Sequence, residues 1–209
     1  MSTDIAKHIP VDRLCLVGGR LCLDFANTAN EVRGRMIDNA LQRYADLPTW
    51  GAKVGLLDPA GAARLQRRAT SRASEAASAL ADALRLREAL WKLFRDEHPD
   101  PTGIEEILNE ALATPIRMRL SSDRSRWVVD PGDDLSTWLL HPVAMSALEL
   151  SSSDRKTRVK TCAGETCGWV FLDESPSGRR QWCSMATCGN RAKARRFHQA
   201  KRSTAGRTA

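Results

Sequence analysis

The chain has 209 residues, a net charge of +7 and 42% hydrophobic residues, which is ordinary for one large domain or for one domain with a small module. No apolar run reaches the ~20 residues that a membrane-spanning helix needs, and the N-terminus lacks the basic and then apolar pattern of a secretion signal. We therefore expect a cytoplasmic protein without membrane contact, in which paired cysteines indicate metal or redox chemistry rather than disulfides.

The first patterned segment runs from Leu21 to Val32. As a helix it places its apolar residues on one face, and Asp24, Asn27 and Thr28 on the other. As a strand it would mix polar and apolar residues on both faces, so we expect a helix. The three polar side chains would offer a carboxylate, an amide and a hydroxyl to a small polar ligand. Capping, or a buried hydrogen-bond network, explains them at least as well.

A run of helices is expected next. The predicted helices extend from Asp46 to about Gly55, from Asp58 to about Glu97 with a break within residues 70–74, and from Thr102 to about Ala113. Thr102 and Glu105 fit a capping box at the start of the last one. Cys15 and Cys22 lie outside the usual spacing of metal ligands, and we expect both to be buried as small hydrophobes.

The pattern changes after this helical part. Ile116, Met118 and Leu120 alternate with polar residues, which predicts a half-buried strand, and residues 127–129 would return as the second strand of a hairpin. A further helix is expected over residues 135–150, bent or broken at Pro142. A polar joint then ends a predicted first domain at residue 154. We expect this domain, residues 1–154, to be α+β, mainly helical with a small β-hairpin or sheet.

Four cysteines form two pairs in the second predicted domain, residues 155–209. Cys162 and Cys167, like Cys183 and Cys188, are separated by four residues, and fifteen residues lie between the pairs. Two such knuckles can close on one tetrahedral Zn²⁺, and four protein ligands leave no open position, so the zinc would be structural. The expected order of knuckle, hairpin and helix outlines a treble-clef finger. No catalytic constellation stands out, and we expect no enzyme.

The positive charge gathers in the same part of the chain. Residues 151–209 hold 13 Lys and Arg against 4 Asp and Glu, whereas residues 1–150 hold 19 against 21. Cations beside a zinc–thiolate centre would absorb only part of this surplus. A solvated charged face is the usual explanation of such a run, but beside a zinc module we favour contact with nucleic-acid phosphates. The candidate residues are Arg179, Arg180, Arg191, Lys193, Arg195, Arg196 and Arg202. Phe197 is expected to pack inward with Ala194.

The cysteine-containing segment resembles a CGNR zinc finger. The matching features are the two cysteine pairs, Phe171, Asp173, Arg180, the run from Trp182 to Met185, and Cys188-Gly189-Asn190-Arg191 with Lys193. The segment from Gly19 to Thr28, with its Leu-Asp-Phe-x-Asn-Thr motif, is similar to the opening of the ABATE domain that usually precedes such fingers. The resemblance implies a treble-clef finger that binds DNA, an α/β domain that binds an unknown small molecule, and a role in stress-responsive transcription regulation.

The function that we favour is therefore a transcription regulator whose ligand-sensing domain controls a DNA-binding finger. An RNA- or ribosome-associated finger would use the same electrostatics, and exposed aromatic side chains would favour it. Because Trp169, Phe171 and Trp182 are expected in the small core, we favour DNA. A zinc–thiolate redox switch or a protein-interaction module is the alternative from another class. A homodimer would add contact area to a single finger, although no heptad pattern indicates one.

Overall fold

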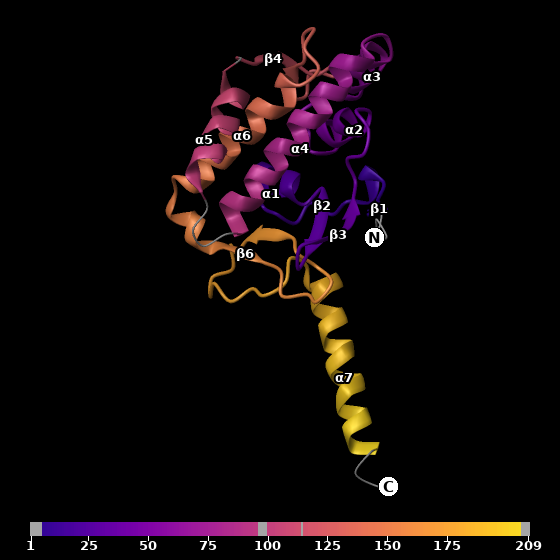
Figure 1. Ribbon diagram of the computed structural model, residues 1–209, viewed down its shortest axis with the longest axis vertical. Coiled ribbons are helices and arrows are strands. Elements are labelled where there is room, and N and C mark those ends of the chain that lie inside the picture. Colours follow the sequence, from indigo (N-terminus) through magenta and orange to yellow (C-terminus); the bar gives the residue numbers. More distant parts are fainter. Residues whose placement is uncertain (1–5, 96–99, 114, 206–209) are drawn as a thin grey trace.

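The computed structural model describes residues 6–95, 100–113 and 115–205, with side chains as far as residue 199. A body of packed helices carries a small sheet on one side, and α7 (Asn190–Ala205) projects away from this body (Figure 1). No helix in those ranges is long and apolar enough to cross a bilayer. The other elements are β1 (Lys7–His8), η1 (Val11–Arg13), α1 (Leu21–Ala26), β2 (Ala29–Val32), β3 (Arg35–Asn39), α2 (Asp46–Lys53), α3 (Pro59–Ser71), α4 (Ala73–Arg95), α5 (Pro101–Leu112), β4 (Arg117–Leu120), β5 (Trp127–Asp130), α6 (Thr137–Ser151), η2 (Asp154–Arg158), β6 (Val159–Thr161), β7 (Val170–Leu172) and η3 (Met185–Gly189).

The main core lies among the helices, where α4 packs on α1, α5 and α6. Its largest fully buried side chains include Phe25, Trp50 and Trp138, and the rings of Phe25 and Trp50 meet edge to face at 5.1 Å. Val170 and Leu172 of β7 belong to the same core. The cysteine-containing segment therefore packs on the helical body through apolar side chains, and burial of these residues stabilises both parts together.

The prediction of one helix over residues 21–32 is only half right. α1 ends at Ala26, and β2 then pairs antiparallel with β3 in a sheet of order β1-β3-β2. Arg33 and Gly34 both have positive φ angles, 54° and 75°, as the two central residues of a type I′ hairpin turn require. This turn, together with the pairing of two strands, outweighs the helical periodicity of the segment.

The predicted helices in the middle of the chain are confirmed, including the break between α3 and α4. The capping box at Thr102 is wrong. Asp100 caps α5 instead, because its carboxylate accepts the N–H of Thr102 at 3.2 Å and Pro101 occupies the first turn. Pro142 does not break α6, which runs unbroken through it between the buried residues Trp138 and Val143.

The hairpin of β4 and β5 is confirmed, but the predicted half-burial of β4 is wrong. Leu120 pairs with Trp127 across the hairpin, and these residues are 45% and 64% exposed. Met118 of β4 is also exposed, at 49%. Only β5 turns apolar side chains, those of Val128 and Val129, into the protein. Alternation of residue types predicted the strand correctly, but it could not indicate which of the two strands faces the core.

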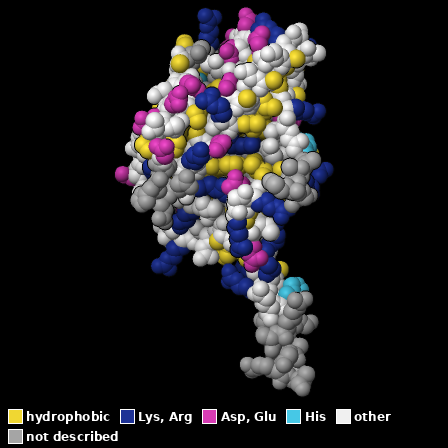
Figure 2. All heavy atoms as spheres, viewed as in Figure 1, with side chains coloured by type: hydrophobic (Ala, Val, Ile, Leu, Met, Phe, Trp, Pro, Cys, Tyr) yellow, Lys and Arg dark blue, Asp and Glu magenta, His cyan; other side chains and the backbone are white. Residues whose placement is uncertain are grey.

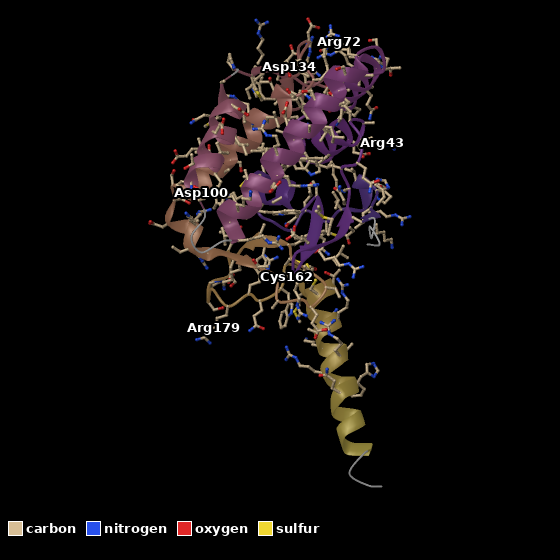
Figure 3. The ribbon with its side chains drawn as sticks, viewed as in Figure 1. Arg43, Arg72, Asp100, Asp134, Cys162 and Arg179 are labelled. Atoms are coloured by element: carbon tan, nitrogen blue, oxygen red, sulfur yellow. The ribbon has the colours of Figure 1, made fainter. Side chains whose placement is uncertain are left out.

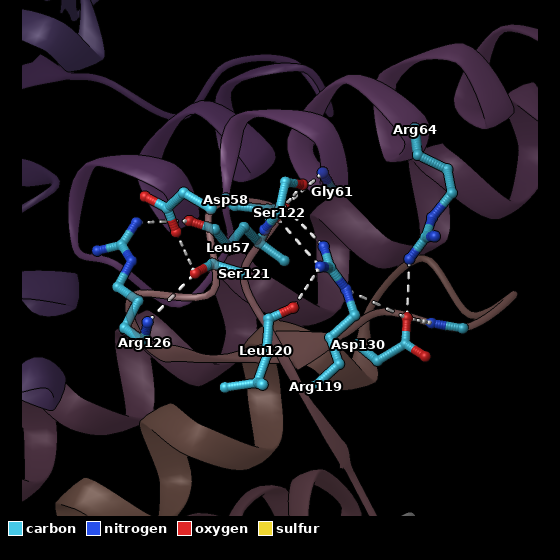
Figure 4. A network of polar contacts seen from close by, with 12 residues as sticks. Leu57, Asp58, Gly61, Arg64, Arg119, Leu120, Ser121, Ser122, Arg126 and Asp130 are labelled. Carbon is cyan, nitrogen blue, oxygen red and sulfur yellow. Dashed lines mark hydrogen bonds and ion pairs between the residues drawn. The ribbon is translucent and has the colours of Figure 1, made fainter.

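Asp58 joins this hairpin to α3 (Figure 4). Its carboxylate caps α3 through the N–H of Gly61 at 2.8 Å, accepts two bonds from Arg119 of β4, and accepts the N–H and hydroxyl of Ser122. The side chain of Asp58 is 4% exposed. The Arg119 guanidinium holds the pKa of Asp58 well below its usual range. One carboxylate thus serves as helix cap and as hairpin anchor.

Candidate metal centre and nucleic-acid interface

The four cysteines predicted from their spacing meet at one point. Their sulfur atoms all lie within 4.8 Å of one another, and all four residues are buried. Sγ of Cys183 lies 3.8 Å from Sγ of both Cys167 and Cys188. A tetrahedral zinc site with Zn–S bonds of ~2.3 Å has S···S edges of about 3.8 Å. The cluster, placed beneath the helical body near Cys162 in Figure 3, therefore fits one structural Zn²⁺.

Local backbone geometry assembles the cluster. In the first knuckle the N–H of Cys167 donates to the carbonyl of Gly164 at 3.0 Å, and the N–H of Cys162 pairs with the carbonyl of Trp169 at the end of the β6–β7 hairpin. In the second pair, Cys183 lies just before η3 and Cys188 lies within it, and α7 continues directly from η3, so Cys188 would tie the start of α7 to the metal. The treble-clef assignment of this arrangement stays a prediction.

Four thiols at this separation cannot all ionise without a cation among them. Hydrogen bonds from Cys167 and Cys183 lower the pKa of Cys162, whereas the bond to Cys162 raises the pKa of Cys167 and of Cys183. Zinc removes this conflict because it binds all four as thiolates. The guanidinium of Arg191 supplies a nearby positive charge, with Nη2 at 3.5 Å from Sγ of Cys188.

Arg180 and Asp173 hold the loop between the two cysteine pairs. The Arg180 guanidinium lies 4.4 Å from the ring centre of Phe171 and donates to the carbonyls of Trp182 and Cys183. Fully buried Asp173 accepts bonds from Lys160 Nζ at 2.7 Å and from the N–H of Arg180 at 2.9 Å. These contacts give Arg180 a structural role; the sequence had offered it both as a cation beside the zinc–thiolate centre and as a phosphate contact.

The remaining basic candidates divide between the base of α7 and the loop. Arg191, Lys193, Arg195 and Arg196 lie on the first turns of α7, where Lys and Arg side chains gather in Figure 2. Arg195 faces Glu165 at 3.5 Å, and Arg196 lies 5.9 Å from the ring centre of Trp182. Arg179 is exposed on the loop, to one side of α7 in Figure 3. The side chain of Arg202 falls outside the described ones.

The aromatic residues of this segment differ from the prediction at one position. Phe171 is buried, and Trp169 and Trp182 pack partly buried against the cysteines. Phe197 was predicted to pack inward with Ala194, but it is 67% exposed, and its ring meets the His198 ring edge to face at 5.9 Å. Because α7 projects away from the body (Figure 1), this side chain faces solvent.

Comparison with known families agrees with this geometry. Residues 19–154 match the ABATE family, described as a putative stress-induced transcription regulator, and residues 158–201 match the CGNR zinc finger. The chain belongs to the ABATE family. Its family description names a regulator and not an enzyme. No match to the chain was found among curated proteins. The domain boundary at residue 154 stays a prediction.

Among the ABATE motif residues, Asn27 bonds the finger directly, whereas Asp24 and Thr28 bond main-chain groups within the ABATE domain. Oδ1 of Asp24 accepts the N–H of Gly18 at 2.8 Å, and the carbonyl of Gly18 accepts the N–H of Leu172 in β7. The Asn27 amide pairs with both main-chain groups of Val170. Thr28 donates its hydroxyl to the carbonyl of Phe25. Asn27 and Thr28 are buried in this hydrogen-bond network, which is the alternative explanation given above; a ligand at these residues stays a prediction.

Two residues of the same contact were missed by the sequence analysis. Asn30 donates to the carbonyl of Thr166 at 3.0 Å and accepts the N–H of Gly168 at 2.8 Å, and Arg95 bonds the carbonyls of Glu31 and Gly168. A Cβ on Gly168 would lie 1.8 Å from the Glu31 carbonyl oxygen, so only glycine fits here. The spacing of Asn27 and Asn30, three residues apart, was the available signal.

Proposed function

We propose that this ABATE-family protein regulates transcription by binding duplex DNA through the first turns of α7. The observation that carries the proposal is the projection of α7 from the zinc centre, with Lys193 and Arg196 exposed on it. Three residues apart, these two side chains lie on the same face of the helix, where both could reach the phosphates of a bound duplex. A helix of 16 residues is about 24 Å long, and the diameter of a helix with its side chains, ~10–12 Å, fits the ~12 Å width of a major groove.

The zinc centre supports this function mechanically. A short basic helix with few apolar contacts of its own is marginal in water. Because Cys188 ends the turn that leads into α7, a bound zinc would fix the direction of the helix relative to the body. The cationic side chains would then meet a polyanion without first ordering the chain, which lowers the entropic cost of binding.

RNA is the second candidate, and one specific observation favours it. Phe197 is exposed beside the basic turns of α7, where it could stack on an unpaired base. We rank DNA first because a single aromatic side chain offers little stacking area. The redox alternative has less support, because the four cysteine residues are only 1–8% exposed to an oxidant.

Fluorescence anisotropy with a random duplex, a random single-stranded DNA and a random RNA, repeated at several salt concentrations, tests the proposal. We expect duplex binding whose affinity falls steeply with salt. Replacement of Arg85 by alanine is the control for replacement of a basic residue of α7, because it also removes one positive charge but lies on α4, away from the finger, where Arg85 pairs with Glu110 at 3.2 Å. Absence of duplex binding at low salt, or stronger binding to the single strands, would refute it.

A further inference from the structure

A hollow of about 280 Å³ lies between the small sheet of the ABATE domain and the zinc centre. The sheet side contributes Cys15, Ile37 and Asp38, and the finger side contributes Trp169, Cys188 and Arg191, among others. We call this space the seam hollow. Its volume is close to the lower end of the ~300–1,000 Å³ that is typical of small-molecule sites. Any molecule that occupied it would touch both halves of the protein at once.

The apolar lining of the seam hollow, which includes Ile37 and Trp169, can bind the apolar part of a ligand. Ile37 lines the hollow and is 37% exposed, so part of its apolar surface is open to a ligand. The Trp169 indole N–H is already donated to the carbonyl of Ala29 at 3.1 Å. The ring therefore offers the hollow only its apolar and π surface, which binds alkyl groups and cations.

The charge of the wall favours a positive ligand. Cys167, Cys183 and Cys188 of the metal centre line the finger side, and zinc with four thiolates carries a formal charge of −2 that Arg191 offsets only in part. Asp38 adds a carboxylate from the sheet side. Lys7 and Asn30 flank Asp38 on the neighbouring strands, but partial burial still raises the pKa of Asp38 above its usual value. This carboxylate is incompletely solvated and would gain from a further cation.

We propose that the seam hollow is a binding site for a small organic cation with an apolar body, held by the carboxylate of Asp38 and the surfaces of Ile37 and Trp169. The site differs from the one suggested by Asp24, Asn27 and Thr28, whose side chains already bond main-chain groups of the protein. Its regulatory meaning rests on the proposed function, since Arg191 at the start of α7 lines the same space. Binding itself does not require DNA.

Cys15 provides a direct readout of occupancy. The prediction that Cys15 is buried is wrong: it is an exposed thiol within the seam hollow, whereas Cys22, as predicted, and the four cysteines of the metal centre are buried. In the zinc-loaded full chain, iodoacetamide should therefore alkylate Cys15 first. Mass spectrometry of the Cys15 peptide measures its rate of alkylation, with and without a ligand, in the absence of any nucleic acid.

The probes are benzyltrimethylammonium, a cation that cannot react with iodoacetamide, and 3-phenylpropionate, an anion with a similar apolar body. We expect millimolar benzyltrimethylammonium to slow alkylation of Cys15 several-fold and 3-phenylpropionate to leave it unchanged. Asp38→Asn should raise the protecting concentration about tenfold. Ile37→Lys, which adds a positive charge at an exposed position, should abolish protection, and Asp154→Asn outside the hollow should preserve it. Zinc content and thermal midpoint verify that each variant is folded.

Three results would overturn the inference: no protection by the cation, equal protection by the anion, or undiminished protection in the folded Asp38→Asn protein. A failure of DNA binding would leave the protection data intact, and a failure of protection would leave DNA binding intact. The two proposals are therefore tested separately.

Discussion

The side-chain amide of Asn27 and the peptide of Val170 exchange two hydrogen bonds across 143 residues of sequence: Nδ2 donates to the carbonyl at 2.8 Å, and Oδ1 accepts the N–H at 2.9 Å. The Asn27 amide thus satisfies the main-chain N–H and carbonyl of Val170 in β7, as a neighbouring strand would. β6 covers one edge of β7, and Asn27 covers the other, so the short hairpin has no open edge at Val170. The Asn27–Val170 pair thereby fixes the position of the finger on the ABATE domain.

Asn27→Ala should therefore destabilise the protein by about 2–4 kcal/mol, because it leaves a buried N–H and a buried carbonyl of Val170 without partners. Urea denaturation of the zinc-loaded protein measures this loss. Asn190→Ala, which removes an exposed amide bonded to the Ala186 carbonyl, is the control and should cost less than about 0.5 kcal/mol. Equal effects of the two substitutions would show that the Asn27 pairing contributes nothing.

The purified protein should contain one zinc ion per chain. Replacing Cys183 and Cys188 by serine should remove it, because a two-thiolate remnant binds zinc weakly, and the helical signal of α7 should decrease with it. Elemental analysis and far-ultraviolet circular dichroism measure the two effects. Cys15→Ser, a change of an exposed thiol outside the four-cysteine cluster, should retain the metal. A native protein without stoichiometric zinc would contradict the metal assignment.

Asp58→Ala should cost about 3–5 kcal/mol, since it removes the cap of α3 and leaves the Arg119 guanidinium without its carboxylate. Asp133→Ala also breaks an ion pair, with Arg68, but the side chain of Asp133 is 82% exposed. This control should change the free energy of unfolding by less than about 1 kcal/mol. Chemical denaturation compares the two, and a similar cost for both would mean that the Asp58 network is not cooperative.

Asp24 should make stability depend on pH. Burial raises its pKa from the ordinary 3.8 to about 6. Between these two pKa values the folded state holds a proton that the unfolded state has released. The free energy of unfolding that Asp24 contributes is therefore complete below about pH 4, decreases as the pH rises through about 6, and is constant at higher pH. The loss is at most about 3 kcal/mol.

Asp24→Asn should eliminate this slope, because the amide oxygen can still accept the N–H of Gly18 but carries no charge. The difference in unfolding free energy between the wild type and Asp24→Asn, measured from pH 4 to 7, isolates the group. Asp58 and Asp173, whose pKa values are lowered, contribute a trend of opposite sign at more acidic pH. A flat difference between the two proteins would show that Asp24 titrates normally.

Substitutions of the basic residues should differ in whether they weaken nucleic-acid binding or destabilise the finger. Lys193→Ala and Arg196→Ala should each lower the slope of log affinity against log salt by about 1, as expected for one lost phosphate contact. Arg180→Ala should instead destabilise the finger, because its guanidinium holds the Trp182 and Cys183 carbonyls. Anisotropy titrations and zinc content distinguish these effects. Unchanged salt slopes in the first two variants would remove α7 from the interface.

The metal centre was predictable from the sequence because its determinants are local. Cys162 and Cys167 belong to one tight turn and Cys183 and Cys188 to another, so residue spacing alone specifies two knuckles that fit one ion. The helices and the family could be predicted for the same reason, since capping residues, helix formers and short motifs act over a few neighbouring positions.

The tertiary structure decided which polar residues find each other. Asn27 and Asn30 bond the backbone of the finger, and Cys15 lies exposed in the seam hollow; the periodicity of the sequence contains neither fact. Hydrogen-bond partners separated by more than a hundred residues depend on where the folded chain brings them. The amino-acid sequence by itself therefore determined the zinc ligands and the family. The contact between the finger and the ABATE domain, and the placement of the charges of the finger, arose only when distant segments packed together.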